Sequence, residues 1–328
     1  MNSIGASRRD LMIGAGALTA GAMLGARLST GSAHAQPAQA GQAPGFYRYK
    51  IGDLIVTAIN DGFATRPIEG FIKNAEMADV QKAMEAAFLP KDALNITFTT
   101  LAIQDGDKLT LIDTGNGDSG APTTGTWMAN FEAAGFDPAD VSTVIFSHFH
   151  GDHINGFRLK DGTAVFPNAQ VLVPEAEWAF WMDDANMSAA SEQAKGAFQN
   201  VRRVFGPIAD KVERFGPEKE VVPGITTIAA PGHTPGHTAF ALSSGEGALM
   251  AMSDTTNHPA LFVRNPDWTA VFDMDGPLAI ETRRKLLDRA AEDRMQVAFY
   301  HAPFPATGHI AKDGSGFQLV PVQWSAAP

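Results

Sequence analysis

The chain has 328 residues, of which 45% are hydrophobic, so it can bury a substantial core in one large domain or in two. Its formal net charge of −11 implies an acidic surface that repels phosphate backbones, which argues against nucleic acid as a partner. The sequence contains no cysteine, and this excludes disulfides, thiolate zinc sites and a cysteine nucleophile.

Residues 1–35 have the features of a cleavable export signal. Arg8 and Arg9 precede a Gly/Ala-rich apolar stretch, and a small-x-small site follows at Ala33-His34-Ala35. The apolar run is shorter than the roughly 20 residues that a spanning helix needs, which favours cleavage near Ala35, or at Ala40, over a retained anchor. The twin-arginine pattern predicts a periplasmic or secreted protein with no stable membrane insertion after signal removal. Residues 36–45 are expected to form a flexible linker.

The remaining residues, 46–328, contain no low-complexity block and no repeat, so we expect a single catalytic domain there. Runs of β-branched residues predict strands, and apolar residues at helical spacing predict helices. In chain order the expected strands are 54–60, 97–103, 108–115, 142–148, 169–174, 221–233, 237–244, 248–254, 295–301 and 317–324. The expected helices are 126–136, a segment that begins at Pro174, 191–205 and 276–293.

This order of elements indicates an α/β or α+β fold without strict alternation. Three strands end in a residue that can bind metal, namely His148, Asp254 and His301. Ligands at strand ends can converge on one edge of a sheet and be held rigidly there.

The stretch "SHFHGDH" carries the strongest chemical signal. It places His148, His150, Asp152 and His153 within six residues, directly after a buried strand, and Gly151 allows a tight turn between them. A solitary histidine is usually a surface or core residue, but four ligand-type side chains in so short a segment rarely form a solvated face. The pattern therefore predicts a metal site.

The spacing His148-x-His150-x-Asp152-His153 resembles the signature of the metallo-β-lactamase superfamily, and "LIDTG" at 111–115 resembles the strand end that precedes it. The resemblance implies an αββα sandwich, in which two facing mixed sheets are flanked by helices. It also implies that His233 is the third histidine ligand, Asp254 a bridging ligand and His301 the last ligand. His237 and His309 compete with His233 and His301 for these places.

We expect the competing histidines to lie outside the ligand set. His237 would then hydrogen-bond behind the ligands, and His309 would line the pocket or bind a carbonyl group behind them. Asp113 at the strand end could orient a ligand histidine, or it could simply form the turn before Thr114-Gly115.

Seven ligands are too many for one tetrahedral ion and fit two ions about 3.5–4 Å apart. His148, His150 and His233 suit one ion, Asp152, His153 and His301 suit the other, and Asp254 can bridge them. Zinc is the first expectation, although manganese, iron and cobalt accept the same ligands. A bridging water would act as the hydroxide nucleophile, and Asp152 could return a proton to the leaving group.

The segments 43–62 and 299–324 resemble the exported methyl parathion hydrolase and lactonase group of this superfamily. That resemblance implies a homodimer acting on small lactones, carboxyl or aryl esters, or organophosphate triesters. Trp178, Trp181 and Phe198 are candidate pocket residues, and core packing is their alternative role. The loop after Gly115 lacks an expected phenylalanine, which favours lactones or esters over phosphotriesters. The alternatives are a β-lactamase or thioesterase of the same superfamily, a mononuclear iron oxidoreductase and a non-catalytic metal-binding protein.

Overall fold

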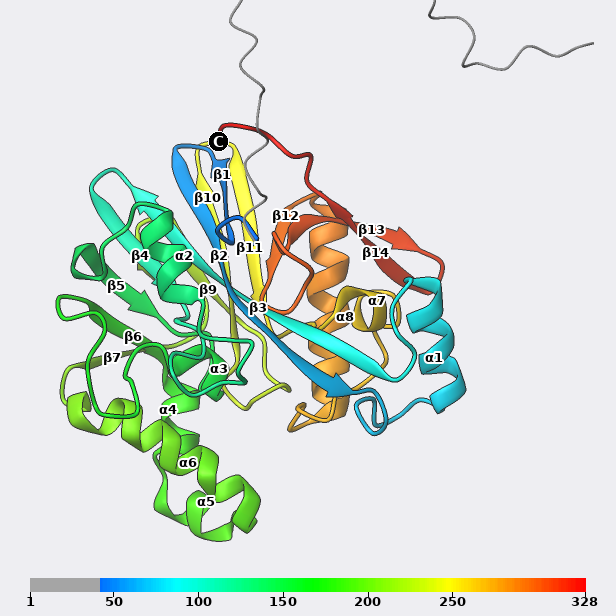
Figure 1. Cartoon of the computed structure of the whole chain (residues 1–328), viewed down its shortest axis with the longest axis horizontal. Helices are drawn as coiled ribbons and strands as arrows, with labels where there is room; N and C mark the ends of the chain where they lie inside the picture. Colours follow the sequence, from blue (N-terminus) through cyan, green and yellow to red (C-terminus); the bar gives the residue numbers. More distant parts are fainter. Residues whose placement is uncertain (1–41) are drawn as a thin grey trace, which may run out of the picture. The chain divides into compact units, whose positions relative to one another are not determined.

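Two seven-stranded sheets face each other in the computed structural model, which describes residues 42–328 (Figure 1). Within this range, Ala43–Pro328 forms one unit. The predicted signal 1–35 and the linker residues 36–41 lie outside the described residues. Among the helices that are described, none is long and apolar enough to cross a membrane.

The first sheet has the order β1-β2-β3-β4-β5-β6-β7. Its neighbours are antiparallel from β1 to β4 and parallel from β4 to β7. Its strands are β1 (Phe46–Ile51), β2 (Leu54–Pro67), β3 (Ala93–Asp105), β4 (Lys108–Ile112), β5 (Val141–Ile145), β6 (Gln170–Pro174) and β7 (Val212–Phe215).

The second sheet has the order β14-β13-β12-β11-β10-β9-β8, and only β11 and β12 are parallel in it. Its strands are β8 (Glu220–Val222), β9 (Ile225–Ala229), β10 (Thr238–Ser244), β11 (Gly247–Ser253), β12 (Gln296–Phe299), β13 (Thr307–Asp313) and β14 (Gly316–Pro321). Both sheets are therefore mixed, and the predicted αββα sandwich is confirmed.

Helices flank the two sheets (Figure 1). They are α1 (Met77–Ala86), α2 (Trp127–Ala133), α3 (Gly151–Ile154), α4 (Glu175–Trp181), α5 (Asp184–Ala189), α6 (Glu192–Phe205), α7 (Pro259–Phe262) and α8 (Gly276–Glu292), with 3-10 turns at Pro138–Asp140 and Gly206–Ile208. Local sequence sets several helix starts. The side chains of Ser191 and Asp275 accept hydrogen bonds from the first turns of α6 and α8, and Pro174 precedes α4.

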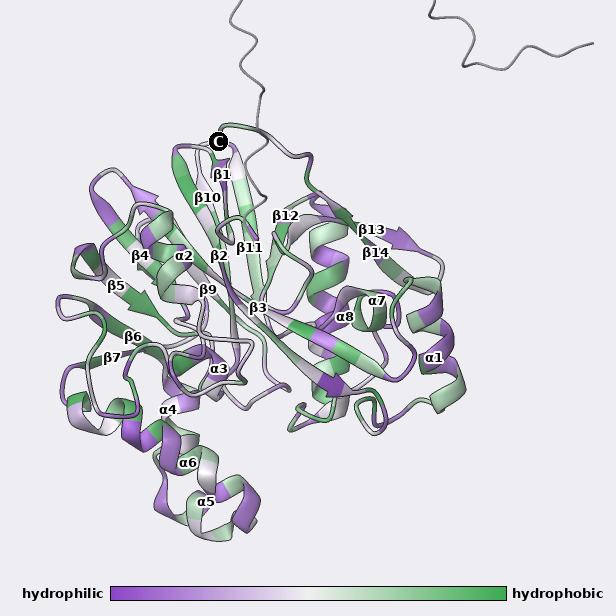
Figure 2. Cartoon of the chain, viewed as in Figure 1, coloured by the Kyte–Doolittle hydropathy of each residue, from purple (hydrophilic) through white to green (hydrophobic). Residues whose placement is uncertain are grey.

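Three apolar layers follow from this arrangement. Val56, Leu101 and Ile145 of the first sheet pack between the sheets against residues such as Phe240 and Leu249 of the second. Side chains of α2, α4 and α6 pack on the outer face of the first sheet, and those of α8 pack on the outer face of the second. Figure 2 shows the corresponding hydrophobic colouring along the strands. Burial of this kind stabilises the fold by about 25 cal/mol per Å² of apolar surface.

The parallel strand pairs position the site. In parallel neighbours the carboxyl ends meet at the same edge of the sheet. Asp113 directly follows β4, and His148 follows β5. In the other sheet Asp254 directly follows β11, and His301 follows β12. The strand-end residues identified in the sequence thus lie at matching edges of the two facing sheets.

Candidate metal centre

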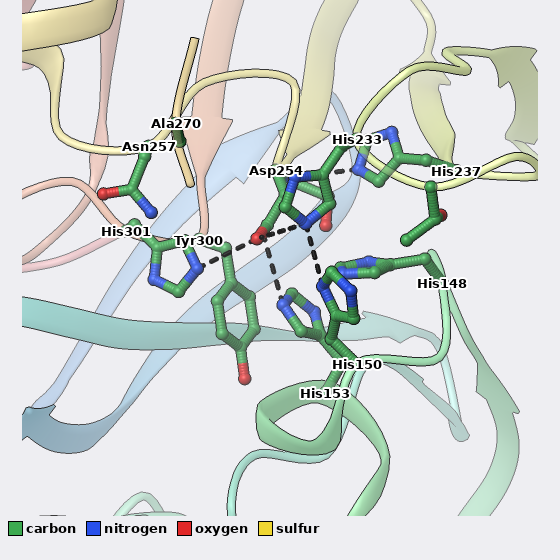
Figure 3. Close-up of polar contacts among 12 residues, drawn as sticks. His148, His150, His153, His233, His237, Asp254, Asn257, Ala270, Tyr300 and His301 are labelled. Carbon is green, nitrogen blue, oxygen red and sulfur yellow. Dashed lines mark hydrogen bonds and ion pairs between the residues drawn. The ribbon is translucent and has the colours of Figure 1, made fainter. Parts of the chain in front are cut away.

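The structure brings the seven predicted ligands together where the two sheet edges meet (Figure 3). Their ligand atoms form three overlapping groups, and within each group the atoms lie within 4.8 Å of one another. The groups are His148, His150 and His233; His148, His153 and Asp254; and Asp152, His153 and His301. The first and third groups match the two sites that the sequence predicted.

Asp254 lies between the two sites. Its Oδ1 is 3.2 Å from Nε2 of His153, and its Oδ2 is 3.3 Å from Nε2 of His233 and 3.0 Å from Nε2 of His301. Figure 3 shows these three rings converging on the carboxylate. A carboxylate that contacts histidines of both groups is placed to bind two cations at once.

Four of the predicted ligand histidines place Nδ1 against a polar group outside the ligand set. Such a contact fixes the orientation and the tautomer of the ring. Nδ1 of His153 lies 2.8 Å from Asp113 Oδ2, and Nδ1 of His301 lies 2.9 Å from the Thr97 carbonyl oxygen. The remaining two pairs are His233 Nδ1 with Asp273 Oδ1 at 3.0 Å and His148 Nδ1 with Ser147 Oγ at 3.0 Å.

Asp113 occupies the orienting position that the sequence suggested. Besides contacting His153, its carboxylate accepts hydrogen bonds from the backbone N–H and the hydroxyl of Ser147. Its φ of 63° lies in the left-handed region, which is uncommon for a residue other than glycine. Such strained conformations concentrate at functional sites, where the surrounding contacts hold them.

The donor atoms themselves indicate that cations belong here. His148 Nε2, His153 Nε2 and Asp254 Oδ1 are buried and make no hydrogen bond among the described residues, although the last two atoms lie 3.2 Å apart. A buried polar atom without a partner costs about 1–3 kcal/mol, so native structures rarely keep three of them together. Imidazole and carboxylate donors in two adjoining sets fit two divalent metal ions.

The charges around the site favour metal binding in two ways. Burial and the nearby rings hold the pKa of His148 and His150 well below its usual value, so both rings are neutral and able to donate a lone pair. Burial opposes a charge on His153, but Asp254, Asp152 and Asp113 together raise the pKa of His153 well above its usual value. The acidic half of the site therefore attracts positive charge, which bound cations would supply.

The two competing histidines have different positions. His237 is buried behind Asp254, where its Nδ1 lies 2.9 Å from the Ala230 carbonyl oxygen and its Nε2 accepts a hydrogen bond from the Asp254 N–H. Burial lowers the pKa of His237 to about 3. The prediction for His309 is wrong. This residue lies in β13, where strand alternation turns its side chain to solvent while Gly308 and Ile310 are buried.

A cavity of about 550 Å³ opens above the centre. Its floor includes His150, Asp152, His233, Asp254 and His301. The loop after Gly115 contributes Asn116, Ser119, Gly120 and Ala121, and apolar walls come from Ala64, Ile96, Phe98 and Phe272. A larger groove of about 920 Å³ lies by α1, α7 and β14, and none of the predicted ligands lines it.

The assignment of Trp178, Trp181 and Phe198 to the pocket is wrong, because none of them lines this cavity. All three are buried in the apolar layer under α4 and α6. Trp181 comes nearest to the centre, since its ring centroid is 6.3 Å from that of His150. Its indole N–H donates to Glu177, and its ring lies edge-on beside the predicted ligand His150.

Sequence reasoning missed three buried polar residues beside the centre. Tyr300 stacks on His153 with ring centroids 3.8 Å apart, and its hydroxyl donates to the Asp152 carbonyl oxygen. Glu177 accepts hydrogen bonds from Thr234 and Gly236, which follow His233. Asp273 contacts His233 directly. Of these three, only Tyr300 could have been identified from the sequence, because it directly precedes His301 at a strand end.

Comparison with known proteins agrees with this geometry. The model of the metallo-beta-lactamase superfamily matches residues 97–301, which is more than half of the chain. An N-acyl homoserine lactonase of a Bacillus species is 21% identical over 238 residues, covering 67% of this chain and 86% of the relative.

Two solved structures share the fold over nearly their whole length. The dizinc quorum-quenching lactonase AidC, solved with a product, has a TM-score of 0.81 and 26% identity over 86% of this chain and 98% of its own. The hydrolase AbOPH has the same TM-score and identity over 87% of this chain and 100% of its own. The chain therefore belongs to the metallo-beta-lactamase superfamily and, like these relatives, is a metal-dependent hydrolase.

Proposed function

We propose that this protein is a dizinc lactonase that also cleaves aryl esters and, more slowly, phosphotriesters. The observation that carries the proposal is the pair of ligand groups joined at Asp254 on the floor of the 550 Å³ cavity. His148, His150 and His233 would hold one ion, and Asp152, His153 and His301 the other. Two ions bound there supply a water activated for attack and a Lewis acid for the substrate carbonyl.

Asp152 and Asp254 have different proposed roles because their exposure differs. The Asp254 side chain is 5% exposed and contacts both histidine groups, which suits a fixed bridging ligand. The Asp152 side chain is 25% exposed and faces the cavity. It can therefore accept a proton at its carboxylate during attack and return it to the alkoxide that leaves when the ring opens.

The cavity walls support a lactone that carries an apolar substituent. Ile96, Phe98 and Phe272 offer apolar surface for such a substituent. Asn116 and Asn257 offer amide groups that can hydrogen-bond to a polar link between ring and substituent. The relatives support the same substrate class, since they include an N-acyl homoserine lactonase and a dizinc lactonase.

A substrate panel combined with metal analysis tests the proposal. Zinc-loaded protein would be assayed with γ- and δ-lactones, 4-nitrophenyl esters, a diethyl aryl phosphotriester and a chromogenic β-lactam. We expect about two metal ions per chain in active protein and the highest kcat/KM on a lactone. Fewer than about two ions in fully active protein, or faster turnover of the β-lactam than of any lactone or ester, would refute this function.

His150→Ala and His309→Ala form a matched pair, because both remove an imidazole but only His150 lies in the centre. We expect His150→Ala to lose metal and to lose at least about a hundredfold in kcat/KM. His309→Ala should keep both metal content and activity. Activity that requires a single iron and consumes oxygen would instead support the oxidoreductase alternative.

We also propose that the protein is exported by the signal in residues 1–35 and acts as a homodimer. Arg8, Arg9 and the site at Ala33–Ala35 support export. Fractionation of cells that produce the full chain should place the shortened protein in the periplasm or medium, and Arg8→Lys/Arg9→Lys should retain it inside. Sedimentation velocity measures the oligomeric state, and a monomer at micromolar concentration would refute the dimer.

A further inference from the structure

The loop Thr269–Asp275 contacts both the cavity and His233. Phe272 lines the cavity and is 38% exposed. The next residue, Asp273, is buried and places its Oδ1 3.0 Å from Nδ1 of His233. Neighbouring side chains of one short loop thus contact the substrate space and a residue of the proposed ligand set.

The Asp273 carboxylate has a complete set of partners. Its Oδ2 accepts hydrogen bonds from the Ala270 N–H at 2.9 Å and from Nη2 of Arg283 at 3.3 Å. Arg283 is itself 1% exposed, and it also donates to the carbonyl oxygens of Thr255, Pro266 and Trp268. Because Arg283 neutralises the buried carboxylate and fixes its direction, Asp273 can hold His233 with Nδ1 as donor.

Backbone contacts bind the same loop to the His233 segment. The N–H groups of Met274 and Asp275 donate to the carbonyl oxygens of His233 and Gly232 at 3.1 and 2.9 Å. Gly232 has a φ of 124°, and a Cβ there would meet the Ala279 nitrogen of α8 at 2.3 Å. Only glycine permits this close approach, so loop, ligand segment and helix are packed as one unit.

A different contact holds the far side of the loop. The Val271 N–H donates to the Phe71 carbonyl oxygen at 2.8 Å, and Ala270 forms a β-bridge with Ile72. The rings of Phe71 and Phe272 meet edge-to-face with centroids 5.7 Å apart. The backbone on both sides of Phe272 is therefore anchored, and little freedom remains for Asp273 to leave His233.

We propose that Asp273 is the positioning residue of the His233 site, holding the ring so that its Nε2 faces the metal. This inference rests on the proposed ligand role of His233. An outer partner of a ligand histidine fixes the tautomer and raises the basicity of the donor nitrogen, and loss of such a partner typically costs 10–100-fold in metal affinity. Figure 3 shows that Nε2 of His233 faces Asp254 and His150.

Metal affinity, rather than activity, gives the decisive test. Metal-free Asp273→Ala and Asp273→Asn would be titrated with zinc in competition with a chromophoric chelator. We expect one of the two binding steps to weaken by about 10–100-fold in Asp273→Ala and by less in Asp273→Asn. The amide oxygen of the asparagine can still accept from Nδ1, at the cost of turning its NH2 group toward the Ala270 N–H and Arg283. The visible absorption of the cobalt-substituted protein should change in the same order.

Asp267→Asn is the matched control. Asp267 belongs to the segment just before the loop, but its carboxylate pairs with Arg284 at the surface. This variant should bind both ions within about twofold of wild type. If Asp273→Ala does not fold, the isosteric Asp273→Asn decides the question.

Wild-type affinities and an unchanged cobalt spectrum in the Asp273 variants would overturn the inference, even if their melting temperature fell. That outcome is distinct from failure of the proposed function. If His150→Ala loses metal while the Asp273 variants keep it, only the positioning role of Asp273 fails. If His150→Ala also keeps its metal, the ligand assignment itself fails.

Discussion

Glu177 is a buried carboxylate whose ionisation should make this fold less stable as the pH rises. It is 0% exposed on α4 and accepts hydrogen bonds from the side chains of Trp181 and Thr234 and from the Gly236 N–H. Burial nevertheless dominates these contacts and raises the pKa of Glu177 from 4.5 to about 7. The folded protein therefore retains this proton at pH values where the unfolded chain has already lost it.

The sign and size of the effect follow from linkage. Because the folded-state pKa is raised, the stabilisation is complete below pH 4.5 and is lost as the pH rises through about 7. Between pH 5 and pH 8 the wild-type protein should lose about 2.5 kcal/mol of stability through this group alone. Glu177→Gln cannot ionise and escapes this loss, although its amide adds a pH-independent cost by facing the Trp181 donor.

The measurement is the difference in unfolding free energy between wild type and Glu177→Gln, taken from denaturant unfolding at pH 5, 6, 7 and 8. The difference cancels the titration of all groups that the two proteins share. It should move by about 2–3 kcal/mol in favour of the variant as pH rises. Glu175→Gln, an exposed change on the same helix, should shift stability by less than about 0.5 kcal/mol throughout. A pH-independent difference for Glu177→Gln would refute the reasoning.

Three further outcomes are expected. Chelation should lower the melting temperature, and free zinc at 100 times the Kd of a site should restore about 2.7 kcal/mol of unfolding free energy for each ion bound; a melting temperature independent of zinc would contradict the site. Phe131→Ala removes a fully buried ring that stacks on Trp127. It should lower the free energy of unfolding in urea by about 3–5 kcal/mol without altering the zinc content of the folded protein. Tyr300→Phe removes the hydrogen bond to the Asp152 carbonyl oxygen and should lower the free energy of unfolding by about 1 kcal/mol. An unchanged free energy of unfolding would mean that a water molecule replaces the hydroxyl group.

The ligand set was predictable because most of its members are marked by local sequence. His148 to His153 lie within six residues, and His148, Asp254 and His301 follow apolar strands. A strand end is visible as the point where a β-branched run stops. Once two parallel strands are neighbours, the residues after them must lie at the same edge. Short-range pattern therefore marked the cluster from His148 to His153 and the strand-end residues, whereas the family resemblance implied the ligand roles of His233, Asp254 and His301.

The pocket walls were not predictable in this way. Trp178 and Trp181 have the size and apolarity that a substrate pocket would use, but these properties suit a core equally well. Their direction depends on which face of α4 packs against the first sheet. The same holds for His309, because neighbouring residues of β13 point to opposite faces of the sheet, one toward solvent and one toward the core.

The sequence by itself determined the signature from His148 to His153, because residue type and spacing are local properties, and the family resemblance carried by that signature implied the roles of His233, Asp254 and His301. Only the tertiary structure decided which walls enclose the cavity and which carboxylates hold the ligand histidines. Asp273 lies forty residues from His233, and their contact exists because the loop before α8 packs across the end of the sandwich. No short-range pattern encodes such a contact, since it arises from the packing of segments distant in the chain.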